Sequence, residues 1–516
     1  MKQPTSASSK VVFNTGILYA KMLITMGISL YSVRLVLNAL GDSDYGIFNL
    51  IAGVIAMLSF LNVAMTASTQ RYLSFHQGTG DFEMQRKVFV NSWILHIGIG
   101  VIVVLLLEML APFLFNGFLN IPAERVATAK VVYHFMTVSV FFTILTVPFT
   151  ASLNAHENML WIAVVNIIES VLKLVIAISL VYFIQTERLS VYGFLTAVLS
   201  INIFLLYATY CLKRYKECTV KDYQIEKPLL QELGGFAGWN LFGALCGIGR
   251  TQGLAILLNI FFGTVVNAAY GIANQVAGQM NFFSATMLRA LNPQIMKSEG
   301  MDDRQRMLRL STMASKFGFF LLAFIAIPCI FEMPAILTLW LKNVPEYSVI
   351  FCSLILIGTL TNQLTIGLQS AIQATGKIKA YQSIVGLVLL FNLPLSYFLL
   401  RLGFFAYSVL ISFCFIELTA CIFRMIFLKK MAGLSIKEYF NRVFLKEILP
   451  IVSSILVCWI ITHTLFFDFR FLVTGIFSTM VFAINVYFFG LCKDEKKIID
   501  TILEKGLIKL KIKNSL

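Results

Sequence analysis

The sequence predicts an all-α integral membrane protein with about 14 transmembrane helices, since an α-helix needs about 20 apolar residues to cross a bilayer. Three observations carry this prediction: 58% of the 516 residues are hydrophobic, only 13% are charged, and long apolar tracts follow one another along the chain. No soluble globular protein requires such a composition. The tracts are 11–37, 45–70, 88–112, 126–150, 158–184, 190–211, 233–262, 264–288, 312–338, 346–372, 381–400, 402–423, 447–465 and 471–492.

The basic residues indicate how the tracts are oriented. Among the 41 Lys and Arg residues, those in the outer set of connections are Arg125, Arg188, Lys342, Arg401 and Arg470. A few more lie inside the tracts, and the rest lie in the tails and the opposite connections. This bias is a positive-inside signal, which places both termini in the cytoplasm and makes the helix count even. It also accounts for the net charge of +15, so we expect lipid and not nucleic acid as the partner of the basic loops.

The remaining composition argues against covalent or metal-bound cross-links. None of the nine cysteines forms a CxxC pair, and nearly all lie in or beside the tracts, where they behave as small apolar residues. We therefore predict no disulfide, no metal site and no other cofactor. The first tract is longer than the apolar region of a signal peptide and lacks a small-residue cleavage site, so it should remain as the first helix.

The two halves of the chain carry a similar corner. Gly41 precedes Tyr45-Gly46 and Gly263 precedes Tyr270-Gly271, each at the junction of the first and second tracts of its half. Glycine suits a tight corner because it adopts backbone angles that other residues avoid. Six is an even number, so both halves share one orientation and their repeat axis runs along the membrane normal. We expect the two Tyr-Gly pairs at equivalent outer corners of two six-helix bundles.

The predicted organisation follows from these bounds, with a pseudo-two-fold axis relating the two bundles. It comprises an N-terminal six-helix bundle at 1–211, a cytoplasmic linker at 212–232, a C-terminal six-helix bundle at 233–423, a cytoplasmic connection at 424–446, two extra helices at 447–492 and a basic cytoplasmic tail at 493–516. Segments 433–446 and 498–513 mix apolar and charged residues as amphipathic helices do, which predicts anchoring at the cytoplasmic interface.

Charged residues inside the tracts are the first candidates for function, because a central Lys or Arg costs roughly 2.5–3.5 kcal/mol on insertion scales. Lys21 and Arg250 lie on polar helical stripes and have no acidic residue one turn away. Lys173 has Glu169 four residues before it, so that pair is either self-neutralising or part of a site. Arg34 lies on a different face of its helix, nearer the outer surface. We expect Lys21 and Arg250 to face a shared cavity between the halves.

Uncharged polar residues extend these stripes. The amides that we predict to line the substrate site are Asn240, Asn274, Asn281, Asn362 and Gln369. Such residues can bind substrate hydroxyls, or they can instead hold tightly packed helices together. At the cytoplasmic edge, Arg71 and Arg289 would meet a substrate first, unless they are ordinary positive-inside residues.

Two six-helix bundles, the glycine corners and Asn292-Pro293-Gln294 resemble the polysaccharide transporters of the multidrug/oligosaccharidyl-lipid/polysaccharide exporter superfamily. Within it, the chain looks like the bacterial O-antigen or capsule-repeat flippases. The resemblance implies a multi-pass protein of the bacterial cytoplasmic (inner) membrane. Its cargo would be an undecaprenyl-pyrophosphate-linked oligosaccharide, moved by alternating access with an H⁺ or Na⁺ gradient as the energy source and with glycan-assembly proteins as partners. Intramembrane cations suit a pyrophosphate, and amides suit sugar hydroxyls.

Two alternatives stay open at this point. A cation-coupled multidrug exporter of the same superfamily would call for intramembrane carboxylates, and the candidates are Glu108, Glu169, Glu332 and Glu417. A membrane glycan polymerase or ligase would call for a cluster of catalytic side chains and usually a large outer loop. The five histidines are scattered and the outer connections are short, so we predict that the protein is not an enzyme.

Overall fold

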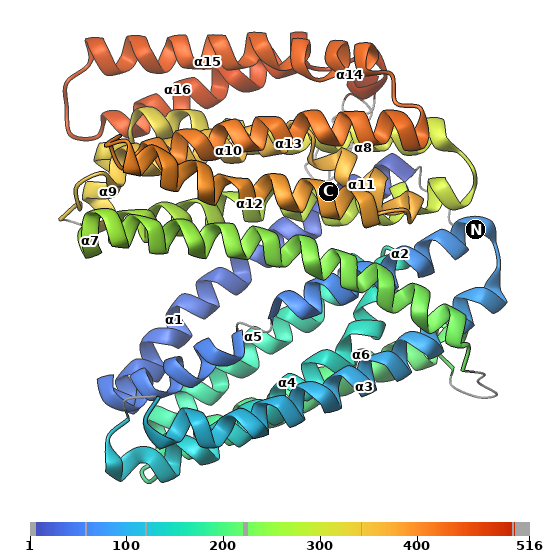
Figure 1. Cartoon of the computed structure of the whole chain (residues 1–516), viewed down its shortest axis with the longest axis vertical. Coiled ribbons are helices and arrows are strands. Elements are labelled where there is room, and N and C mark those ends of the chain that lie inside the picture. The colour runs from blue at the N-terminus through green and yellow to red at the C-terminus, as the bar shows by residue number, and fades with distance from the viewer. Residues whose placement is uncertain are drawn as a thin grey trace, which may run out of the picture. The chain divides into compact units, whose positions relative to one another are not determined.

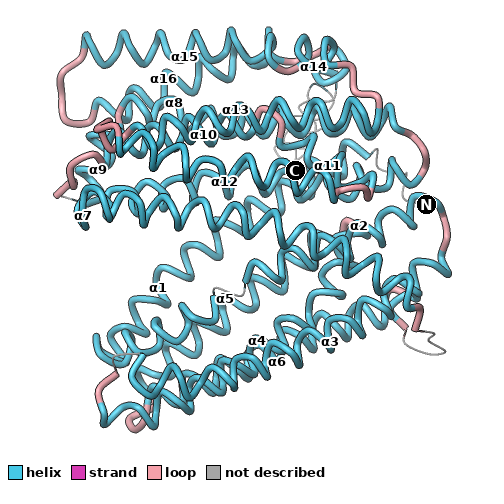
Figure 2. The backbone as a smooth tube through the Cα atoms, viewed as in Figure 1, coloured by secondary structure: helices cyan, strands magenta, loops and turns pink. Residues whose placement is uncertain are grey.

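The computed structural model describes residues 7–56, 59–118, 121–219, 225–341, 343–497 and 500. Within these ranges the regular elements are helices and no strand is present, as Figure 2 shows. The all-α prediction is therefore confirmed. Contacts divide the chain into two compact units, one of residues 14–241 and one of 1–13 with 242–516. The predicted helix at 498–513 lies, apart from residue 500, outside the described residues.

The first unit is a bundle of long apolar helices. They are α1 (Ala7–Ala56) from residue 14 on, α2 (Ser59–Thr79), α3 (Phe82–Phe113), α4 (Val126–Ala155), α5 (Met159–Tyr182), α6 (Arg188–Arg214) and the beginning of α7 (Lys227–Gly300). Figure 1 shows α3, α4 and α6 side by side, and α4 packs against both neighbours. The core between α3 and α4 includes Tyr133, whose hydroxyl donates to the carbonyl oxygen of Leu107 at 2.6 Å. That hydrogen bond satisfies a phenol that is otherwise surrounded by apolar side chains.

The second unit contains the rest of α7 and every later element. Its helices are α8 (Arg304–Phe331), α9 (Met333–Leu341), α10 (Ser348–Gln363), α11 (Ile366–Thr375), α12 (Lys379–Arg401), α13 (Ser408–Ala432), α14 (Ile436–Arg442), α15 (Phe444–Thr464) and α16 (Arg470–Asn485). The short α14 lies within the predicted amphipathic segment 433–446. In Figure 1, α15 and α16 lie side by side, and both contact α8.

The number of membrane spans is close to the predicted 14. Eleven described helices are long and apolar enough to cross a membrane, or twelve if α10 and α11, which bend by 43° at their junction, form one span. Lys227–Phe282 counts as one span of 56 residues, although a kink at Gly263 divides it into the two predicted tracts. The predicted tract 45–70 includes residues 57 and 58, which lie outside the described ranges.

A glycine kink follows the first helical segment of each half, as the sequence predicts. Gly41 has φ 75° and ψ 170°, and Gly263 has φ 79° and ψ −167°. This region of backbone angles is open essentially only to glycine. The expected equivalence of Tyr45-Gly46 with Tyr270-Gly271 stays a prediction. Tyr45 follows its kink glycine by four residues and Tyr270 by seven, so almost one helical turn separates them in register.

Two ion-pair groups attach the C-terminal segment to α8. At one end, Arg470 donates two hydrogen bonds, of 2.9 and 3.0 Å, to the carboxylate of Glu332, and Thr474 donates to the same carboxylate at 2.7 Å. At the other end, the ammonium of Lys316 pairs with Glu495. Lys316 is fully buried. We call these two groups the α8 clamps.

Candidate functional site

The second unit buries an ion-pair network among α7, α10 and α13. The Nη1 of Arg250 on α7 donates to Oε1 of Glu417 on α13 at 2.7 Å. The Nδ2 of Asn362 on α10 donates to the other carboxylate oxygen, also at 2.7 Å. The side chain of Glu417 is only 3% exposed. A carboxylate buried in this way requires a paired charge and hydrogen bonds to both oxygens, and the network supplies them.

A second arginine extends the network along the same face of α13. Arg424 lies two turns after Glu417, and its Nη1 donates to Oγ1 of Thr365 at 3.2 Å and to the carbonyl of Asn362 at 3.4 Å. That carbonyl also accepts from the Thr365 N–H at 3.3 Å, at the junction where α10 ends at Gln363 and α11 begins at Ile366. A broken span exposes backbone groups that a continuous helix would satisfy, and a buried arginine is one way to satisfy them. Arg424 therefore stabilises the bend between α10 and α11.

The network carries an excess of positive charge. It holds two guanidinium groups, Arg250 and Arg424, against one carboxylate, Glu417. The guanidinium of Arg250 also lies over the ring of Phe413, with 4.5 Å to the ring centroid, a favourable cation–π distance. The Nε of each arginine is buried and has no hydrogen-bond partner among the described residues. The network is thus a buried polar site in which two N–H donors have no partner among the described residues.

The expectation that Arg250 lacks an acidic partner is wrong. Its partner Glu417 comes from α13, 167 residues later in the chain, and a search one turn away on the same helix cannot find it. Arg424 is the first residue of the predicted connection 424–446, and the structure places it buried within α13, which continues to Ala432. The seven-residue spacing of Glu417 and Arg424 is the signal in the sequence that could have placed both on one helical face.

The other predicted cations differ in their surroundings. Lys173 pairs with Glu169 at 2.7 Å, and its side chain is 55% exposed, so the expected pair forms on the surface of α5. Lys21 is half-buried in α1 and has a partner, whereas Arg34 is exposed on the same helix. Arg71 is 6% exposed, and its guanidinium lies over the rings of Tyr72, Phe75 and Phe236 at 4.4 to 5.6 Å. Arg289, the second residue predicted to meet a substrate first, is exposed.

Among the predicted amides, only Asn362 joins the Arg250 network through a described hydrogen bond. Asn240 donates to the carbonyl of Phe236 and Asn274 to that of Tyr270, each one turn back on α7. Such bonds fit the alternative role of these residues in helix packing. Asn281 is exposed and Gln369 is half-buried. Their roles in binding a substrate remain predictions.

The described residues offer no preformed metal site. No group of three or more His, Cys, Asp or Glu side chains among them is arranged to hold a metal ion. Four carboxylates considered for a drug or coupling-ion site each have a basic partner: Glu108 with His134, Glu169 with Lys173, Glu332 with Arg470 and Glu417 with Arg250. Nothing in this part of the chain points to a catalytic group or a nucleophile.

These features define a polytopic helical membrane protein with buried polar groups, and its fold is that of the MATE transporters. A mutant MATE of known structure matches with a TM-score of 0.72 at 13% identity, covering 83% of this chain and 96% of the other. An outward-facing multidrug resistance MATE transporter of the MOP superfamily matches at 0.71 and 14%, with the same coverage. A MOP superfamily transporter from Pyrococcus furiosus, described as having a binding pocket of reverse polarity, matches at 0.70 and 15%.

Sequence comparison gives a narrower result. Residues 18–179 match the MatE family model, which is a stretch of the first unit from α1 into α5. A search of curated protein sequences finds no match. The chain is therefore similar in fold to MATE transporters along most of its length and similar in sequence to the MatE family over its first third.

Proposed function

We propose that the chain is a secondary transporter that exports amphipathic organic molecules from the cytoplasm by alternating access, without a chemical step. The observation that carries the proposal is the fold match over 83% of the chain to an outward-facing multidrug resistance transporter. The MatE match at residues 18–179 supports it independently. A multi-pass protein with few charged residues can present buried polar groups to a substrate at the middle of the bilayer. This proposal takes the drug-exporter alternative as the leading function.

We propose that the Arg250–Glu417 ion pair opens and closes during the transport cycle. Breaking a buried ion pair leaves an uncompensated charge, so the pair opens only when another group takes over one of the partners. A proton or Na⁺ can neutralise Glu417, and an anionic substrate group can neutralise Arg250. Either exchange would couple binding in the second unit to a change of state.

A second candidate is the flippase for undecaprenyl-pyrophosphate-linked oligosaccharides, and the charge of the network favours it. Two arginines with unpaired Nε groups face one carboxylate, which suits an anionic headgroup better than a cationic drug. The four carboxylates that the sequence offers for a drug site each have a basic partner among the described residues. On this reading the protein works in a bacterial inner membrane beside glycan-assembly proteins.

Transport by the purified protein in proteoliposomes tests both candidates. One assay follows a fluorescent cationic drug under an imposed H⁺ or Na⁺ gradient, and the other follows a fluorescent undecaprenyl-pyrophosphate sugar from one leaflet to the other. Movement of the drug supports the exporter, and movement of the lipid-linked sugar supports the flippase. If neither compound moves with any gradient, the proposal of amphipathic transport fails.

Substitution at Arg250 checks the role of the network in that assay. We expect Arg250→Gln to abolish transport per molecule of folded, reconstituted protein, because the charge that holds Glu417 is lost. Arg250→Lys should restore part of the activity, since it keeps the charge but loses the planar guanidinium. Lys173→Gln serves as the control, because it removes a positive charge from an exposed pair. Normal transport by Arg250→Gln would exclude the network from the mechanism.

A further inference from the structure

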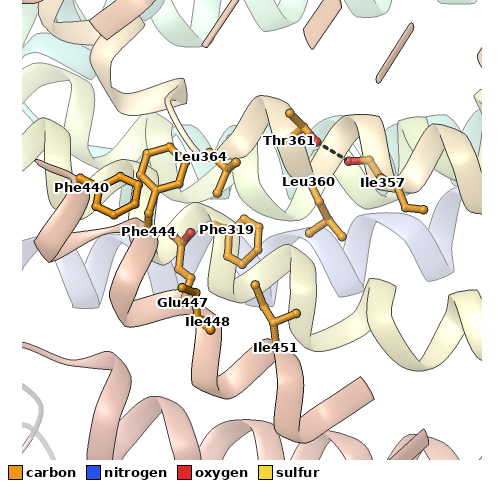
Figure 3. A pocket seen from close by; sticks show the side chains of 10 residues that line it. All are labelled: Phe319, Ile357, Leu360, Thr361, Leu364, Phe440, Phe444, Glu447, Ile448 and Ile451. Atoms are coloured by element: carbon orange, nitrogen blue, oxygen red, sulfur yellow. Dashed lines mark hydrogen bonds between the residues drawn. The ribbon is translucent and has the colours of Figure 1, made fainter. Parts of the chain in front are cut away.

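A small cavity in the second unit lies where the C-terminal helix pair meets the preceding helices. It has a volume of about 340 Å³ and is lined by residues of α8, α10, α14 and α15. Its lining is apolar apart from Thr361 and Glu447, and the Thr361 hydroxyl donates within its own helix to the carbonyl of Ile357 (Figure 3). The volume is in the range of small-molecule sites. Glu447 is therefore the lining residue whose polar side-chain atoms have no hydrogen-bond partner among the described residues.

Glu447 is buried and unsatisfied. The residue is 1% exposed, and neither of its carboxylate oxygens has a hydrogen-bond partner among the described residues. Figure 3 shows its carboxyl group directed toward the rings of Phe319 and Phe444. Glu447 lies in the first turn of α15. A carboxylate buried at this position is stable only with a cation beside it.

The cation that acts on Glu447 electrostatically is committed to other partners. Lys316 on α8 lies within electrostatic range of Glu447. However, an ammonium has three N–H donors, and those of Lys316 serve Glu495, the carbonyl of Gly490 at 3.4 Å and Sγ of Cys492 at 3.5 Å. Glu447 and Glu495 thus both lie near Lys316, and Lys316 forms its ion pair with Glu495.

The rest of the lining suits a cation attached to an apolar body. Phe319, Phe440 and Phe444 contribute three aromatic rings to the wall, and those of Phe440 and Phe444 stack with centroids 5.4 Å apart. Aromatic faces attract ammonium groups most strongly where water is excluded. Ile448 and Ile451 of α15 continue the wall with aliphatic surface. The carboxylate and the aromatic rings suit the charged nitrogen of an amphiphilic amine. The aliphatic side chains suit its hydrocarbon part.

We propose that this cavity binds a lipophilic ammonium compound, whose charged nitrogen pairs with Glu447 while its hydrocarbon part fills the space between α8, α10 and α15. The ligand completes the charge balance that Lys316 leaves open. It also bridges the C-terminal helix pair to α8 and α10. The same chemistry is available from a free alkylamine or from the amine headgroup of a membrane lipid. This inference does not depend on what the protein transports.

Binding to the full-length protein in phosphatidylcholine nanodiscs tests the proposal. Radiolabelled decylammonium is the probe, and empty nanodiscs measure its partition into lipid. We expect saturable binding to the protein, with decanol, the uncharged analogue, failing to compete at equal concentration. Glu447→Gln should weaken binding by about tenfold or more, because a hydrogen bond between charged groups is lost. Equal affinity of wild type and Glu447→Gln, or equal competition by decanol, would overturn the proposal.

Two further variants separate the site from general effects. Glu438→Gln is the matched control, because it removes a carboxylate from the adjacent α14 whose side chain is 62% exposed and pairs with Arg442. It should bind the probe as wild type does. Ile448→Trp fills the cavity from a partly exposed position without changing charge, and it should abolish binding. Binding by Ile448→Trp at wild-type affinity would place the ligand elsewhere and contradict the proposal.

Lipid composition distinguishes the two sources of the amine. If phosphatidylethanolamine in the nanodisc lowers the apparent affinity of wild type for decylammonium, the natural occupant is a lipid headgroup. If the affinity is unchanged, a free lipophilic amine is the occupant. Both results support the ammonium site, which fails only on the outcomes with Glu447→Gln, Ile448→Trp and decanol.

Discussion

Arg250 illustrates which features of single residues the sequence reveals. Its depth in the membrane, its polar neighbours and its importance as a buried charge are all visible from composition and helical periodicity. Its partner is not visible, because Glu417 lies on a helix that reaches it only through folding. The local pair Glu169–Lys173 is four residues apart and was found correctly. Local ion pairs can thus be predicted from spacing, whereas partners brought together by tertiary packing cannot.

A double-mutant cycle measures the coupling of Arg250 to Glu417. We expect Arg250→Gln and Glu417→Gln alone to destabilise the protein, by about 3–5 kcal/mol when one partner of a buried pair is left behind. The double variant should be more stable than the sum of the single effects predicts. Thermal denaturation of the detergent-solubilised protein provides the measurement.

The exposed pair supplies the control for this cycle. Lys173→Gln breaks a surface ion pair, and such pairs contribute about 0–1 kcal/mol. Its melting temperature should therefore stay close to that of the wild type. Additive effects of the two substitutions at Arg250 and Glu417 would show that the pair is not energetically coupled.

At the scale of helices, glycine residues predict the two kinks but do not predict the break between α10 and α11. Gly41 and Gly263 mark both kinks, because only glycine adopts their backbone angles readily. The break between α10 and α11 carries no such mark at Leu364 and Thr365. It is associated with close packing instead: a Cβ on Gly367 would lie 2.0 Å from the carbonyl oxygen of Ser311 on α8. A break that depends on a neighbouring helix cannot be predicted from the local sequence.

Replacement of the kink glycine tests this reading of α7. We expect Gly263→Ala to destabilise the protein by about 1–3 kcal/mol, because alanine is strained at these backbone angles. No neighbouring atom lies within 4 Å of the position a Cβ would take, so the effect would come from the backbone alone. Thermal denaturation reports the change.

Gly271→Ala in the helical part of α7 is the comparison. Space is equally open there and φ is not positive, so alanine should be neutral or stabilise by up to about 1 kcal/mol. Equal behaviour of Gly263→Ala and Gly271→Ala would mean that the kink at Gly263 is not present in the membrane.

For the whole molecule, composition was enough to predict an all-helical membrane fold, and apolar tracts gave nearly all of its spans. The fold likeness to MATE transporters extends over 83% of the chain at about 13% identity, so the pattern of apolar segments, and not the identity of side chains, specifies this architecture. The pattern of apolar segments does not predict the substrate, which depends on a few polar contacts whose charge balance changes when distant helices supply partners, as Glu417 does for Arg250.

The orientation of the chain in the membrane remains a prediction, and site-directed labelling can test it. Cysteines introduced at Glu187 and Glu346, which are exposed in connections of the outer set, should react in intact cells with a membrane-impermeant maleimide. Cysteines at Arg304 and Lys379 should react only after the cells are opened. The native cysteines provide a low background, since most of them are buried. Labelling of Arg304→Cys in intact cells would reverse the proposed topology.

The α8 clamps have a consequence for the history of the chain. Glu332 and Lys316 receive their partners, Arg470 and Glu495, from sequence that follows α14. A gene shortened after Gly433 would still encode α1 to α13, but its product would present a carboxylate and an ammonium to hydrocarbon. Loss of the last two helices is therefore tolerable only if both charges are replaced first.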